Sequence, residues 1–299
     1  MAPDCMRKFS YFLLLLLGLA FTTSAQADSP PAKPAMRIGL TPVILDDQAA
    51  FLSAWRVYLE RHLGRPVIFT QRGTYREILE LLREGKLDFA WLCGYPYVRN
   101  KNQFRLVAVP LYRGEPLYHS YLIVPASDKK TLALAGLSGK VFAFSDPDSN
   151  SGYLYPEYLL AQKNLTPASF FFRSFFTWSH REVVEAVASG LADGGAVDSY
   201  VWDTLSRTHP ELTSRTRIVS ESPQFAFPPI VASPSVSMSD LKAFQTVLFS
   251  MEEDDEGASL LDKLNLNGFV YGNASLYANI ADMSRFVERK RINAAPQGH

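Results

Sequence analysis

Two segments of this chain repeat one helix-and-strand pattern, and the repeat constrains the fold more than any other feature. The first, "TYREILELLREGKLDFAWL", begins at Thr74, and the second, "SHREVVEAVASGLADGGAV", begins at Ser179. Each opens with a hydroxyl residue and a Glu three positions later, which is a capping box, and each passes through Gly and Asp into a strand-like run. The shared register predicts two lobes of like construction. Since capping boxes and terminal glycines are common, chance similarity is the alternative.

Strand-like and helix-like runs alternate around the first of these segments. "MRIGL" from Met36 and "PVIFT" from Pro66 have the composition of strands. Between them, residues 48–63 place Leu52 and Trp55 on one helical face. This βαβ rhythm predicts an α/β fold of two lobes, each with a mixed, mainly parallel sheet flanked by helices.

The N-terminal 27 residues have the features of a secretory signal peptide. A basic start precedes the apolar run "FLLLLLGLAF" from Phe12, and the small-residue cleavage pattern "AQA" ends at Ala27. The apolar run is too short to span a bilayer stably. Residues 28–35 are rich in Pro and predict a disordered lead-in. We therefore expect an exported, soluble chain that begins near Asp28.

Boundaries for the two lobes follow from the repeat and from two short crossings. The expected parts are one lobe at 36–119 with 224–290, the other lobe at 120–223, and a tail at 291–299. The crossings near 118–122 and 221–224 are the expected hinges. Short hinges suit two lobes that close on a cleft.

Composition excludes several classes of partner. The chain carries 30 basic and 30 acidic side chains, so it lacks the basic footprint that nucleic acid or an anionic membrane surface requires. The expected mature part holds one cysteine, Cys93, so it cannot form an intramolecular disulfide. Its histidines are scattered, and no Walker or dinucleotide glycine pattern occurs. We expect no metal and no cofactor.

A cluster of short hydrogen-bonding side chains follows the strand-like run "KVFAFS". The cluster consists of Ser149, Asn150 and Ser151, just before Gly152. In open α/β sheets, ligands bind beyond the carboxyl ends of strands, so this loop is a candidate nest for an anion. A plain Asx turn with a helix cap is the alternative. Pro156 requires either that the first turn is separate from the main helix or that the helix kinks.

His180, Asp198, Tyr95 and Tyr97 are the other candidates for this site. If Ser179 caps its helix, the ring of His180 lies at the helix start, where it can donate to an anion and where an anion favours its charged form. Asp198 follows a predicted strand, and its carboxylate can face an anion only if the ligand brings a proton or an ammonium. The phenols of the two tyrosines can close the site from the first lobe. The structural alternatives are an exposed helix start, a helix cap and aromatic packing.

Several motifs resemble those of one known family. They are "RIGLTP", "GYPYV", the loop from Asp146 to Pro156, the "SHREVVEAVASGLAD" helix, "GAVDS" and "DEGASLLDKLNLNGFV". With them the chain resembles, over nearly its whole expected mature length, the periplasmic substrate-binding proteins of phosphonate, phosphite and phosphate ABC transporters. The resemblance implies a type II periplasmic-binding-protein fold with a ligand cleft between the lobes. It implies oxyanion contacts from these side chains: Tyr97, Ser149, Asn150, Ser151, His180 and Asp198. Asn150 stands where the family usually has Thr, which leaves the preferred oxyanion open.

The function that follows is binding, with no catalytic residue. We expect a monomeric periplasmic protein that captures a phosphonate, phosphite or phosphate for an ABC importer, with a permease as its partner. The same module can instead be an exported sensor that signals to a membrane histidine kinase. A Ser/His/Asp hydrolase is a lesser alternative, because Ser151 lies in S-N-S-G-Y and not in a G-x-S-x-G nucleophile elbow.

Overall fold

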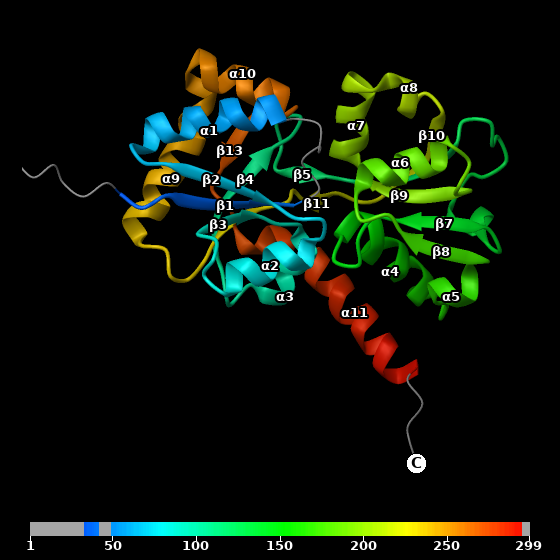
Figure 1. The fold of residues 1–299 in the computed structure, drawn as a ribbon. Coiled ribbons are helices and arrows are strands. Elements are labelled where there is room, and N and C mark those ends of the chain that lie inside the picture. Colours follow the sequence, from blue (N-terminus) through cyan, green and yellow to red (C-terminus); the bar gives the residue numbers. More distant parts are fainter. Residues whose placement is uncertain (1–32, 42–48, 295–299) are drawn as a thin grey trace, which may run out of the picture. The chain divides into compact units, whose positions relative to one another are not determined.

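The computed structural model describes residues 33–41 and 49–294, and the predicted signal peptide lies outside this part of the chain. Two principal β-sheets, each flanked by helices, make up the described residues (Figure 1). The α/β class predicted from the sequence is therefore confirmed. No helix in these two stretches is both long and apolar enough to cross a membrane.

The first sheet has six strands in the order β13–β4–β12–β3–β1–β2. Their bounds are β1 (Met36–Leu40), β2 (Val67–Gln71), β3 (Phe89–Trp91), β4 (Arg105–Leu111), β12 (Ile230–Ala232) and β13 (Gly268–Val270). β1 pairs in parallel with β2 and with β3, as the βαβ rhythm predicts. β12 runs antiparallel between β3 and β4, so a late segment of the chain completes the sheet that the first segments begin.

The second sheet has five strands in the order β10–β6–β9–β7–β8. Their bounds are β6 (Ser120–Pro125), β7 (Val141–Phe144), β8 (Arg173–Phe176), β9 (Gly194–Asp198) and β10 (Thr216–Glu221). β7 pairs in parallel with β8 and β9, whereas β6 is antiparallel to both β9 and β10.

The sheets are mixed, as predicted, but the expectation that they are mainly parallel is corrected. The first sheet has two parallel and three antiparallel neighbouring pairs, and the second has two of each. Parallel pairs occur where a helix crosses over between strands. The remaining strands enter their sheets by other routes, and strand composition carries no information about their direction.

Helices cover both faces of the first sheet. Those on one face are α1 (Ala49–Leu63), α9 (Met238–Ser250) and α10 (Asp255–Lys263), and those on the other are α2 (Tyr75–Arg83) and α3 (Gly94–Asn100) (Figure 1). The Trp55 ring of α1 lies 5.1 Å from the Phe69 ring and 6.4 Å from the Trp91 ring, between ring centroids, which joins this helix to the sheet. α2 has the capping box that the sequence predicts, between Thr74 and Glu77.

The second sheet is covered in the same way. One face carries α6 (His180–Ala188), α7 (Ser199–Thr208) and α8 (Pro210–Thr213), and the other carries α4 (Tyr155–Gln162) and α5 (Pro167–Phe170) (Figure 1). α6 packs directly on β9, because a Cβ added at Gly195 would lie 2.5 Å from Val183 Cγ1 and 3.1 Å from the Ala143 carbonyl oxygen. Close packing of α6 brings its first residue to the carboxyl end of β9.

Two crossings and a long terminal helix connect the two sheets. β5 (Leu117–Tyr118) and β11 (Phe225–Ala226) pair antiparallel at the crossings. Short 3-10 turns complete the described elements at Leu134–Leu137 (η1), Met251–Glu253 (η3) and Ala274–Tyr277 (η4). α11 (Ala278–Ala294) contacts both α3 and α4. Its last turn includes residues 291–294, where the sequence predicts a tail. The Arg291 guanidinium donates to the Glu157 carboxylate of α4 over 2.8 Å, which anchors this turn.

Candidate ligand site

The loop after β7 forms a capped turn, and its role as an anion nest stays a prediction. Ser149 caps a π-helical turn, η2 (Asn150–Leu154), and its hydroxyl accepts from the Gly152 N–H over 3.0 Å. α4 begins only at Tyr155, so Pro156 lies in the first turn of a new helix, where its missing N–H costs little. The first turn is therefore separate from the main helix, which decides between the two alternatives that Pro156 left open.

Gly152 allows this turn to pack against two other residues of the site. A Cβ added to it would lie 1.9 Å from Ser145 Oγ and 3.0 Å from His180 Cε1. Any side chain at this position would collide with Ser145. The position is closed to every residue but glycine.

His180 is the first residue of α6, with Ser179 as its cap, as predicted. The backbone N–H of Asp198 lies 3.1 Å from His180 Nδ1, and Nε2 of the same ring lies 3.3 Å from Ser149 Oγ. A backbone N–H can only donate, so Nδ1 is the unprotonated nitrogen and the ring proton is on Nε2. Complete burial lowers the pKa of His180 to about 3. Without an anion the ring is therefore neutral, because a second proton would have to replace the Asp198 contact, and the expectation that an anion favours its charged form stays a prediction.

The Ser149 hydroxyl is left with a hydrogen to donate. Its oxygen accepts from His180 Nε2 and from the Gly152 N–H, which uses both of its lone pairs. Its own O–H points to neither partner. A chain of donors thus runs from the Asp198 backbone through His180 to Ser149.

Three buried polar atoms near this donor chain have no hydrogen-bond partner among the described residues. They are Ser145 Oγ, Asn150 Oδ1 and Ser151 Oγ, each on a residue that is at most 1% exposed. An unsatisfied buried polar group costs about 1–3 kcal/mol. Three such atoms within one short loop are candidates for hydrogen bonds to a small polar ligand.

Side chains that the sequence did not single out for the site hold the loop from the side of the first sheet. Cys93 Sγ accepts from the Asn150 N–H over 3.3 Å, and Tyr118 OH accepts from Asn150 Nδ2 over 2.9 Å. The Tyr75 N–H donates to Asp146 Oδ2 over 3.2 Å. Because Tyr75 is the residue of α2 that corresponds to His180 in α6, the sequence repeat contained a signal for it. No motif in the sequence indicated that Tyr118 contacts this loop.

Tyr95 and Tyr97 lie in α3 and are buried, at 5% and 3% exposed. The ring of Tyr97 packs edge-on against Tyr277, with 4.8 Å between centroids, and the Arg99 guanidinium lies 5.5 Å from the Tyr95 ring centroid. Within the described chain, neither phenol has a recorded hydrogen bond to the Ser149–Ser151 loop. Their contact with a ligand stays a prediction.

Asp198 ends β9 and caps α7, where its Oδ1 accepts from the Tyr200 N–H over 2.8 Å. Burial raises the pKa of Asp198 to about 8, although backbone hydrogen bonds from Tyr200 and Val201 lower it. The side chain is therefore mostly protonated at neutral pH. A protonated Asp198 can donate, so it does not by itself require that the ligand bring a proton.

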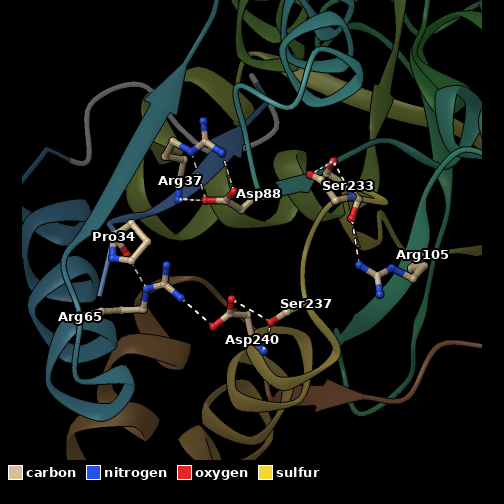
Figure 2. Close-up of polar contacts among 9 residues, drawn as sticks. Pro34, Arg37, Arg65, Asp88, Arg105, Ser233, Ser237 and Asp240 are labelled. Atoms are coloured by element: carbon tan, nitrogen blue, oxygen red, sulfur yellow. Dashed lines mark hydrogen bonds and ion pairs between the residues drawn. The ribbon is translucent and has the colours of Figure 1, made fainter. Parts of the chain in front are cut away.

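Four arginines of the described chain, two near this loop and two at the opposite end of the first sheet, lie close to carboxylates. Arg76 and Arg99 lie 3.8 and 3.6 Å from the carboxylate of Asp148. Figure 2 shows the amino end of the first sheet, where Arg37 pairs with Asp88 and Arg65 lies between the Asp240 carboxylate and the Pro34 carbonyl. These residues line a cavity of about 280 Å³ whose charges are already paired. The donors that the Ser149–Ser151 loop itself offers are neutral hydroxyl and amide groups.

The chain has two β-sheets flanked by helices, and a buried polar loop lies at the strand ends, where residues associated with both sheets contact it. This arrangement is that of a two-lobed solute-binding protein. The sequence model of the family described as "ABC transporter, phosphonate, periplasmic substrate-binding protein" matches residues 38–277. The chain belongs to this family of periplasmic substrate-binding proteins of phosphonate ABC transporters. Its fold is that of the type II periplasmic binding proteins.

Individual relatives agree with this assignment. The chain is 24% identical, over 297 residues, to the phosphonates-binding periplasmic protein of Escherichia coli (strain K12), with 94% of this chain and 87% of that protein covered. A binding protein component of an ABC phosphonate transporter from Pseudomonas aeruginosa has a similar structure, with a TM-score of 0.81, 23% identity, and 89% and 91% of the two chains covered. The structure of PhnD1 from Prochlorococcus marinus (MIT 9301) in complex with methylphosphonate is also similar. Its TM-score is 0.77 and its identity 21%, with 85% of this chain and 98% of that chain covered.

Proposed function

We propose that this protein captures a small phosphorus oxyanion, namely a phosphonate, phosphite or phosphate, and delivers it to an ABC importer. The observation that carries the proposal is the donor chain that ends in the Ser149 hydroxyl, next to the unpartnered hydroxyl of Ser151. The family and the methylphosphonate complex of a structural relative support the same ligand class.

Neutral donors are sufficient for this task. Micromolar affinity corresponds to about −8 kcal/mol. A hydrogen bond to a charged group contributes about 1.5–3 kcal/mol, so a handful of them outweigh the cost of ordering ligand and loop. The hydroxyls of Ser145, Ser149 and Ser151 can donate to such a ligand without any Lys or Arg.

Binding is favoured over hydrolysis by the direction of the hydrogen bonds. Ser149 and His180 lie as close as a nucleophile and its base, but a base needs a free lone pair on the nitrogen that faces the hydroxyl. Here that nitrogen carries the proton. Asp198 offers the ring its backbone N–H and not its carboxylate. The arrangement therefore cannot accept the serine proton, and no residue is assigned a catalytic role.

The proposed setting is the periplasm, with residues 1–27 as the signal peptide, a permease as the partner and a monomeric state. The lobes proposed to close on the ligand are 36–119 with 224–290, and 120–223. In support, each sheet draws all of its strands from one of these two sets of residues. The family match favours transport over signalling to a histidine kinase.

Ligand titration of the purified mature protein tests the proposal. Methylphosphonate, phosphite or phosphate should raise the melting temperature, because a ligand that binds only the folded state stabilises it. Ser149→Ala should weaken the binding by about tenfold or more, since one charge-assisted hydrogen bond is lost. Phosphorus NMR of the mixture should show no new product. If all three anions leave the melting temperature unchanged, the ligand class is wrong, and steady turnover that Ser149→Ala abolishes would favour an enzyme.

A further inference from the structure

We propose that Asn150 presents its carbonyl oxygen to the ligand and thereby selects oxyanions that carry a P–OH group over anions of the same shape and charge that lack one. This inference rests on the proposed function and names the specificity of that same site. It would make Asn150 a specificity-determining residue and not merely one more donor of the loop.

The Asn150 amide lies with its nitrogen against Tyr118. Nδ2 donates to Tyr118 OH over 2.9 Å, while the backbone N–H of Asn150 is engaged by Cys93 Sγ over 3.3 Å. The side chain is fully buried, so water does not compete for either end of the amide. Tyr118 OH takes one of the two hydrogens of Nδ2, whereas Oδ1 has no partner among the described residues and is one of the unpartnered buried atoms of the loop.

The phenol of Tyr118 is suited to hold the amide in this way. Burial raises the pKa of Tyr118 well above its ordinary value, so the group remains a neutral phenol whose oxygen can accept from Nδ2. The Ser151 hydroxyl lies close enough to lower that pKa slightly, yet it makes no hydrogen bond of ordinary geometry. Ser151 is therefore still available to donate elsewhere.

A carbonyl oxygen can only accept, so the ligand atom opposite Oδ1 has to bring a hydrogen. The Ser149 and Ser151 hydroxyls can donate to the other oxygens of the same ligand. An oxyanion with one P–OH and further unprotonated oxygens matches both kinds of group. An anion with unprotonated oxygens alone leaves Oδ1 unsatisfied and faces it with a second acceptor, and mismatches of this kind support strong discrimination.

Methylphosphonate monoanion and methanesulfonate are a matched pair of ligands for the test. Both are singly charged and tetrahedral with one methyl group, and they differ in the central atom and in the one hydrogen that the phosphonate carries. Calorimetric titration with both, at one pH at which methylphosphonate is a monoanion, keeps every titratable group of the protein in the same state. The wild type should prefer methylphosphonate by about tenfold or more, as expected for one buried acceptor left unsatisfied.

Two substitutions at the same position separate the roles of the amide. Asn150→Thr introduces a hydroxyl that can donate as well as accept, so the preference should shrink to within about threefold. Asn150→Asp keeps the shape but offers only acceptors, so it should keep or increase the preference. Tyr118→Phe removes the partner that orients the amide and should reduce the preference. Asp240→Asn, at the opposite end of the first sheet, should leave it unchanged. Thermal melting of each variant shows whether it folds.

The possible outcomes distinguish this inference from the proposed function. A wild type that binds none of methylphosphonate, phosphite and phosphate overturns the proposed function and this inference with it. A wild type that binds methylphosphonate and methanesulfonate equally overturns the inference alone, as does a folded Asn150→Thr with an unchanged preference. A folded Asn150→Asp that loses the preference also overturns it.

Discussion

The backbone N–H of Asp198 donates to Nδ1 of His180 over 3.1 Å, and this one contact determines what the histidine can do. It places the ring proton on Nε2, where it meets Ser149 Oγ, and it leaves no lone pair for a second proton. His180 is therefore a neutral donor throughout the physiological range of pH. In this form Nε2 faces Ser149 with a proton and not with the lone pair that a general base needs.

This neutral donor role predicts the effect of replacing His180. His180→Ala should weaken oxyanion binding by about tenfold, because Ser149 loses one of its two donors and its hydroxyl is no longer oriented. His180→Gln should bind more tightly than His180→Ala, since its amide can also donate. Calorimetry at several pH values is the measurement. The ratio of wild-type to His180→Ala affinity should stay constant from about pH 5 to about pH 8, because the pKa of this ring, about 3, lies below that range. A ratio that rises steeply on acidification would show that the charged ring binds the ligand.

Acid stability should also depend on His180. Its folded-state pKa of about 3 lies below the ordinary value of 6.5. Below pH 6.5 the unfolded chain therefore binds a proton at this residue that the folded chain does not bind. Stability contributed by the neutral ring is present above 6.5 and is lost as the pH falls toward 3. Urea unfolding at about pH 7 and about pH 4 should show that the wild type loses more stability than His180→Gln. Equal losses would contradict the assigned burial of the ring.

Asp198 should give the opposite pH dependence. Its folded-state pKa of about 8 lies above the ordinary 3.8, so the contribution of the protonated form is present below 3.8 and is lost as the pH rises through 8. Asp198→Asn keeps an oxygen for the Tyr200 N–H but cannot ionise. In unfolding experiments on the ligand-free proteins, the free energy of unfolding of the variant relative to that of the wild type should rise as the pH increases from about 5 to about 9. The rise should be on the order of a few kcal/mol. Asp240→Asn, which removes a half-buried carboxylate paired with Arg65, is the control and should show no such gain.

The tight approach at Gly152 predicts a severe effect from a single methyl group. Gly152→Ala should destabilise the fold by about 2–4 kcal/mol and abolish ligand binding, because the new Cβ would lie 1.9 Å from Ser145 Oγ. Adding Ser145→Gly removes the obstructing side chain and should recover part of the stability. Gly73→Ala is the matched control, since the nearest atom to its Cβ is 4.0 Å away. Equal melting temperatures for the two single variants would disprove the close approach.

The last turn of α11 should be anchored by its ion pair with α4. The Glu157 side chain is 8% exposed and is paired with Arg291, so Arg291→Ala leaves a buried carboxylate without its partner. We expect a loss of about 1–3 kcal/mol in the free energy of unfolding, less than for a fully buried pair because Arg291 is half exposed. Arg285→Ala, which breaks an exposed pair with Asp282 on the same helix, should cost less than about 0.5 kcal/mol. A double-mutant cycle with Glu157→Ala measures the coupling directly.

The sequence by itself determined the features that depend on near neighbours in the chain. The capping box of Thr74 and Glu77, the start of α6 at His180 and the Ser149 cap are local hydrogen bonds written in residues three positions apart, so pattern and propensity predict them. The α/β alternation follows from the same local periodicity. The repeat even placed Tyr75 where His180 stands in the other lobe, although its contact with Asp146 was not anticipated.

Only the tertiary structure decided the properties that arise between distant segments. The tautomer of His180 depends on a backbone group of β9, and the orientation of the Asn150 amide depends on Tyr118 at a crossing between the sheets. The raised pKa of Asp198 comes from burial by elements that the local sequence does not name. Strand direction also depends on distant segments. β12 pairs antiparallel with β3 and β4 of the first sheet, although it follows all strands of the second sheet in the sequence. A residue type limits which hydrogen bonds a side chain can make, whereas the packed neighbours choose among them, since burial removes the water that would otherwise satisfy every alternative.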